Sequence, residues 1–129
     1  MNAYIIELPN RPGSLADICE AVASGGANIT GVTGATAGDA GQVAITTDDM
    51  DGTRAAIQAH GWRFREVALV SASLEHRAGT LGDAARRLAN AGINIDTMFV
   101  SGMEGGKVQV AFGVPDADAA RAALGDLAS

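Results

Sequence analysis

The sequence predicts an α+β fold of two ferredoxin-like βαββαβ units in tandem, each an antiparallel sheet with helices on one face. Three observations predict it. A stretch near the N-terminus recurs later in the chain, segments with period-two alternation are followed by segments with helical spacing, and residues 62–74 contain no Gly, Pro or Asn. The last strand of one unit is therefore expected to run almost directly into the first strand of the next. We assign the units to residues 1–67 and 68–129.

The repeat aligns without a gap over some twenty positions. Residues 10–17 (NRPGSLAD) line up with residues 76–83 (HRAGTLGD), an offset of 66, and residues 26–29 (GANI) line up with residues 92–95 (GINI) at the same offset. Identical Arg, Gly, Leu, Asp, Asn and Ile residues recur at equivalent places. Chance would not readily give that match, so the chain is predicted to be a tandem duplication.

In the first unit, Tyr4–Leu8 alternates as a half-buried strand does, and residues 10–13 are typical of a turn. Ser14 followed by Asp17 matches the capping-box pattern and predicts a helix that ends at Gly25–Gly26. The expected buried stripe of this helix is Leu15, Ile18, Cys19 and Val22. We further expect strands at 28–33, 42–46 and 62–67, a helix at 52–59, and a flexible connection in the glycine-rich stretch 31–41.

The second unit follows the same order. Strands are expected at 68–74, 93–100 and 108–114, and helices from Thr80 to about Gly92 and over 116–127. Thr80 with Asp83 repeats the capping-box pattern, and the buried stripe is Leu81, Ala84, Ala85 and Leu88. No residues follow the last helix to form a final strand. We expect a second chain, or the first unit, to cover the edge left open.

Composition excludes several classes of function. The net charge is −6 and the nine basic residues are scattered, which argues against nucleic acid or an anionic membrane as partner. Cys19 is the only cysteine, no Cys-x-x-Cys pair occurs, and no stretch approaches the ~20 apolar residues of a membrane span. We therefore expect a cytoplasmic protein without metal or cofactor. No phosphate loop, nucleophile elbow or convincing carboxylate pair is present, so the sequence does not predict an enzyme.

The repeated Arg-x-Gly loop is the best candidate for a binding site. Gly13 and Gly79 lack a side chain, so backbone amides at the helix start can approach a ligand closely. Those amides suit a carboxylate, and the carbonyl oxygen of Asn10 suits an ammonium group. Gly13→Val is then expected to abolish binding and to leave the fold largely intact. The same residues also suit an ordinary turn and helix start, with no ligand.

Residues 10–15 followed by residues 26–29 resemble the ACT domain, a small regulatory module of amino-acid metabolic enzymes, and the second copy resembles it too. The resemblance implies that an amino acid binds where two such units lie side by side. His76 and Ala78 depart from the usual Asn or Asp and Pro, so the first copy is the stronger candidate. The implied binding residues are Asn10, Arg11, Pro12, Gly13, Ser14, Leu15, Asn28 and Ile29, and in the second copy His76, Arg77, Ala78, Gly79, Thr80, Leu81, Asn94 and Ile95.

Three functions remain open at this stage. The first is a non-catalytic amino-acid-binding regulatory module that forms a homodimer or a higher homo-oligomer. The alternative is a regulatory subunit that binds and controls a separate biosynthetic enzyme such as acetolactate synthase. The third is a small ferredoxin-like enzyme, since this fold hosts many chemistries, but no acid or base can be named for it.

Overall fold

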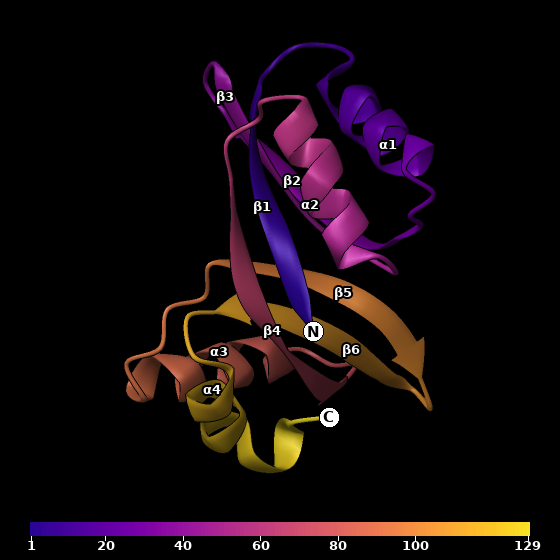
Figure 1. Cartoon of the computed structure of the whole chain (residues 1–129). Helices are drawn as coiled ribbons and strands as arrows, with labels where there is room; N and C mark the ends of the chain where they lie inside the picture. The colour runs from indigo at the N-terminus through magenta and orange to yellow at the C-terminus, as the bar shows by residue number, and fades with distance from the viewer. The chain divides into compact units, whose positions relative to one another are not determined.

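The computed structural model describes residues 1–129 and divides into two compact units, Asn2–Glu66 and Val67–Ser129 together with Met1. Each unit follows the predicted order of strands and helices, so the α+β fold with its repeated pattern is confirmed. The two units are coloured indigo to magenta and rose to yellow in Figure 1. None of the helices combines the length and the apolar character that a bilayer span requires.

The first unit contains three antiparallel strands in the order β2-β3-β1. Its elements are β1 (Asn2–Pro9), α1 (Ser14–Ser24), β2 (Ile29–Ala37), β3 (Ala40–Thr47) and α2 (Met50–Ala59). The N–H of Glu7 donates to the carbonyl of Arg63 at 2.9 Å, which places the start of the next strand, β4 (Phe64–Glu75), beside β1. Helices α1 and α2 lie on the same face of the strands (Figure 1).

The core of the first unit lies between those helices and that face. Tyr4, Ile6 and Val43 alternate with residues of the other face, as the strand period requires. Burial of such side chains contributes roughly 1.5–3 kcal/mol each. The buried cluster consists of Tyr4, Ile6, Ile18, Val22, Ala27, Val43, Ile45 and Ile57.

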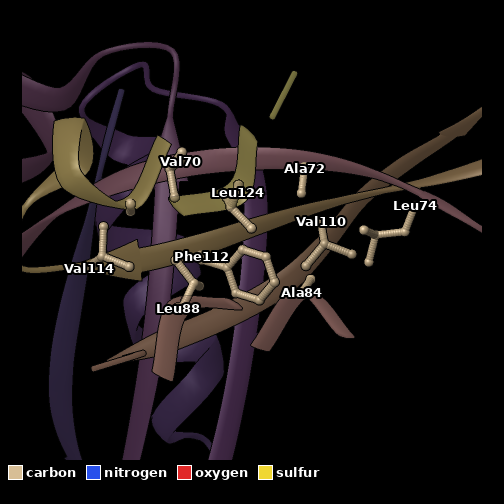
Figure 2. Packing of buried hydrophobic residues seen from close by; sticks show 10 residues of the cluster. Val70, Ala72, Leu74, Ala84, Leu88, Val110, Phe112, Val114 and Leu124 are labelled. Carbon is tan, nitrogen blue, oxygen red and sulfur yellow. The ribbon is translucent and has the colours of Figure 1, made fainter. Parts of the chain in front are cut away.

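The second unit repeats this arrangement with the strand order β4-β6-β5. Its elements are β4 (Phe64–Glu75), α3 (Thr80–Asn90), β5 (Thr97–Glu104), β6 (Lys107–Val114), α4 (Ala117–Leu124) and a 3-10 turn (Gly125–Leu127). Figure 2 shows the ring of Phe112 among the side chains of Leu88, Ala84 and Val110 in its core. The prediction that one strand runs into the next is confirmed, because residues 64–75 form a single strand.

No full strand follows α4 in the second unit, and terminal residues meet β4 instead. The N–H of Leu69 donates to the carbonyl of Met1 at 2.8 Å. The N–H of Ser129 donates to the carbonyl of Ser71 at 3.0 Å, beside a bridge between Ala72 and Ala128. Part of the edge of β4 is therefore paired.

Several local expectations are wrong, among them the strand expected at 93–100, since β5 begins only at Thr97 and runs to Glu104. The capping boxes do not form, because the N-cap residues are Gly13 and Gly79 and neither helix has a side-chain cap. The Ser14 hydroxyl instead donates to the carbonyl of Pro9 at 2.7 Å. The stretch 31–41 does form a hairpin connection as expected, but most of it is strand: β2 ends at Ala37 and β3 begins at Ala40, which leaves a turn of two residues.

Candidate functional site

The two Arg-x-Gly loops have the same backbone conformation. Gly13 has φ 93° and ψ −13°, and Gly79 has φ 92° and ψ −15°. Side chains with a Cβ rarely adopt this left-handed region, so glycine is needed for the turn itself. A β-branched residue at Gly13 is strained there, so we expect Gly13→Val to lower stability in addition to the loss of binding expected from the sequence.

A groove of about 510 Å³ lies between the first loop and the hairpin of β2 and β3. That volume falls within the range of small-molecule sites, roughly 300–1,000 Å³. From the loop, Asn10, Arg11, Ser14 and Leu15 line it. The other lining residues are Leu8, Pro9, Val32, Thr33, Gly34, Ala35, Thr36, Gly41, Gln42 and Val43.

Leu15 lies in this groove and not in the core, contrary to the predicted helical stripe. Its side chain is 54% exposed, and its counterpart Leu81 is 41% exposed. The buried residues of α1 are instead Ser14, Ile18, Ala21 and Val22. A large apolar side chain at the mouth of a groove is available for contact with a ligand.

Two backbone N–H groups at the start of α1, those of Leu15 and Ala16, have no partner within the chain. The first N–H groups of a helix lack intrahelical acceptors, and here the Gly13 carbonyl receives only the N–H of Asp17. These groups and the positive end of the helix dipole favour an anionic oxygen. Arg11 adds the single ionised side chain of the groove lining and lies 3.6 Å from Asp17.

Asn10 ties the loop to the hairpin turn. Its Nδ2 donates to the carbonyl of Gly38 at 2.8 Å, and its N–H donates to the carbonyl of Asp39 at 2.9 Å. The side-chain oxygen of an amide so held remains an acceptor, as a bound ammonium requires. The loop and the hairpin are therefore held together and form the two sides of one groove.

Asn28 and Ile29 do not line this groove. The N–H of Asn28 donates to Oδ1 of Asp48 at 2.7 Å, and Ile29 packs against the core. In the second unit, Asn94 donates to Asp96 at 2.7 Å and Ile95 packs against the other core. The wall that faces the loop is formed by residues 32–36, in the middle of β2.

Sequence reasoning missed that wall because it assigned the glycines to a loop. Read as strand, residues 29–37 alternate, and Val32, Gly34 and Thr36 share one face. A glycine inside a strand often marks a close approach of a ligand or another backbone. That alternation was the feature of the sequence from which this wall of the groove could have been predicted.

The second loop preserves the backbone and the hydroxyl contact at the helix start, but it differs in two side chains. The Thr80 hydroxyl donates to the carbonyls of Glu75 at 2.7 Å and Arg77 at 3.1 Å, as Ser14 does to Pro9. His76 and Ala78 are exposed at the positions of Asn10 and Pro12. The second loop therefore has the same backbone shape as the first, but it presents different side chains to solvent.

A separate polar cluster surrounds Glu66 at the start of β4. Asn2 donates to Glu66 at 2.8 Å and Arg54 pairs with it at 2.8 Å. The hydrogen bond from Asn2, together with Arg54, lowers the pKa of Glu66. Burial, mainly, raises the pKa of Tyr4, whose hydroxyl donates to the Met50 carbonyl. Each of these groups has a partner within the fold, which is typical of a structural network.

Three other hollows of the first unit are smaller than this groove, and the smallest measures about 150 Å³. One of about 460 Å³ is bordered by Glu7, Asp39, Trp62 and Arg63, and one of about 320 Å³ by Asp17, Glu20, His60 and Trp62. His60 and Trp62 stack with ring centroids 4.6 Å apart. No cluster of three or more His, Cys, Asp or Glu side chains that could hold a metal ion is present. The groove beside the first loop is therefore the best candidate site.

The family model of the ACT domain matches residues 4–56. This segment carries an ACT domain match. It contains the first Arg-x-Gly loop and every residue that lines the groove. The resemblance seen in the first copy is thus supported by the family model, whose match ends before the second copy. No curated protein matches the chain in sequence.

Solved structures share the fold over almost the whole chain. The protein BT0572 from Bacteroides thetaiotaomicron is 20% identical with a TM-score of 0.76, and the match covers 95% of this chain and 85% of that one. The ligand-free regulatory subunit of aspartate kinase from Thermus thermophilus is 23% identical with a TM-score of 0.71, covering 95% and 89%. At these identities the likeness establishes the fold.

Proposed function

We propose that this protein is a non-catalytic regulatory module that binds a free amino acid in the groove beside the first Arg-x-Gly loop. The observation that carries the proposal is the pair of unpartnered N–H groups of Leu15 and Ala16 at the edge of a groove of about 510 Å³. They suit the α-carboxylate, and the Oδ1 of Asn10 suits the α-ammonium group. The ACT domain match over this segment supports the same assignment.

Thermal unfolding in the presence of each common amino acid tests this function. A ligand at a hundred times its dissociation constant adds about 2.7 kcal/mol to the free energy of unfolding. We expect a clear rise in midpoint with at least one amino acid. No rise with any of them at millimolar concentration contradicts the proposal.

A matched pair of variants tests the location of the site. Leu15→Glu places a carboxylate where the ligand carboxylate is proposed to bind, and Leu81→Glu makes the equivalent change in the second unit. Both side chains are substantially exposed, so we expect small changes in basal stability. Loss of the ligand response in Leu15→Glu alone is the expected result. Equal loss in both variants, or in neither, argues against the first loop.

A second function is a regulatory subunit that holds and switches a separate enzyme. The likeness to solved regulatory subunits of aspartate kinase favours this function, and the match covers 89% of one such subunit. Aspartate kinase is thereby a more direct candidate partner than acetolactate synthase. Recovery of a stoichiometric amino-acid biosynthetic enzyme with the tagged chain supports this function. A homodimer that binds its ligand without such an enzyme supports the first.

A further inference from the structure

Two glycines form part of the groove floor in the first unit. Gly34 of β2 pairs with Val43 of β3, and Gly41 of β3 pairs with Thr36 of β2. Val43 belongs to the core on the helix-covered face, so Gly34 and Gly41 lie on that same face. Neither glycine has the positive φ that would require glycine for the backbone. Their lack of a side chain instead leaves the groove open above them, although a Cβ on Gly41 would already contact Cγ2 of Thr36 at 3.4 Å.

The second unit has valine at both equivalent positions. The strand register places Val100 opposite Val110, as Gly34 is opposite Val43. Val108 likewise corresponds to Gly41, because it pairs with Leu74 of β4 as Gly41 pairs with Leu8 of β1. Two isopropyl groups therefore stand at the positions where the first unit has only hydrogen, and that of Val100 is 61% exposed. The two copies share a loop but differ in the floor beneath it.

The walls around the open space are largely apolar, although Asn10, Arg11, Ser14, Thr33, Thr36 and Gln42 also line the groove. Leu8, Leu15, Val32 and Val43 border it, and no carboxylate lies among the lining residues. A charged ligand side chain placed there loses its hydration and gains no partner of opposite charge, apart from Arg11 at the loop. An aliphatic side chain, in contrast, is removed from water against aliphatic surface at no such cost.

We infer that the first groove selects an amino acid with a branched aliphatic side chain, of the class of valine, leucine and isoleucine, and that the side chain lies over Gly34 and Gly41. This inference rests on the proposed function, since it assumes that an amino acid binds at the first loop. The second unit, with Val100 and Val108 in the equivalent space, does not bind the ligand. One chain therefore carries one site.

Isothermal titration calorimetry with the purified full chain tests the inference. The probes are valine, leucine, isoleucine, lysine and aspartate. We expect one equivalent of branched aliphatic amino acid to bind per chain, at least tenfold more tightly than lysine or aspartate. Two equivalents per chain overturn the assignment of a single site.

Exchanging equivalent residues between the two units gives variants that test the position of the ligand side chain. Gly34→Val copies the second unit into the first, and Val100→Gly makes the reverse change. A Cβ on Gly34 meets the Gln42 carbonyl oxygen at 3.4 Å and the Val43 side chain at 3.8 Å, which are ordinary contacts, and valine favours strands. We therefore expect Gly34→Val to keep its unfolding midpoint and to lose at least tenfold in affinity. Val100→Gly keeps its affinity.

The outcomes separate the two proposals. Tighter binding of lysine or aspartate overturns the aliphatic selectivity and leaves the amino-acid site in place. Undiminished affinity in a folded Gly34→Val variant overturns the position of the side chain. No heat of binding and no thermal shift with any amino acid overturns the proposed function itself.

Discussion

Replacing Gly13 by alanine isolates the conformational demand of the first loop. With φ at 93°, the residue occupies a region that costs an L-amino acid about 1–2 kcal/mol. A Cβ there meets only Nη1 of Arg11, at 4.0 Å, so no steric clash adds to that cost. We expect Gly13→Ala to lower the free energy of unfolding by about 1–2 kcal/mol, somewhat offset by the stiffer unfolded chain.

Two other glycines provide the controls. Gly79→Ala faces the same φ with open space around the Cβ, so the loss should match that of Gly13→Ala. Gly82 lies in α3, has no positive φ and has open space, and alanine there should gain up to about 1 kcal/mol. Urea denaturation without ligand measures all three. A neutral or stabilising Gly13→Ala refutes the reasoning, since the loop would then not need the left-handed conformation.

Three further changes probe the packing and the polar network. Thr53→Val removes the 2.8 Å hydrogen bond between the buried hydroxyls of Thr47 and Thr53, while the Asp49 N–H still donates to Thr47 at 3.2 Å, so urea denaturation should show a loss of about 0.5–1.5 kcal/mol. Gly113→Ala brings a Cβ within 2.6 Å of Thr97 and should lower stability by about 1–3 kcal/mol, whereas an unchanged urea midpoint means that the site relaxes freely. Because the pKa of Glu66 is lowered in the folded state, its carboxylate stabilises the fold at pH values above the ordinary glutamate pKa of about 4.3. That stabilisation is lost as the pH falls through the folded pKa. Glu66→Gln should therefore flatten the fall of the thermal midpoint between about pH 5 and 3, and an equally steep fall in the variant contradicts this.

The fold was predictable because the duplication gave two independent readings of one pattern. Local periodicity and turn chemistry predicted three features that the structure contains. These are the strand at Tyr4–Leu8, the ends of the helices near glycines, and the continuous strand within residues 62–74. The start of α1 was misplaced by one residue, because a Ser-x-x-Asp pattern occurs both at an N-cap and one position later. Only the backbone angle of Gly13 distinguishes these cases.

The groove was half predictable. The loop side follows from the repeated motif, whereas the strand side depends on the pairing register of β2 with β3, which is a non-local property. Leu15 illustrates the difficulty, since helical spacing assigned it to the core and the motif assigned it to the site. The structure places its side chain in the groove because the buried face of α1 is formed by Ser14, Ile18, Ala21 and Val22, which leaves Leu15 to one side of it.

The near-identical turns at Gly13 and Gly79 also bear on how such a protein can change over generations. The shape of the turn depends on one glycine, whereas the lining of the groove depends on residues in other elements. Mutations in the lining are therefore free of the constraint that preserves the turn. A duplicated chain can alter the lining in one copy while both copies still fold, and Gly34 and Val100 differ at equivalent positions of the two copies.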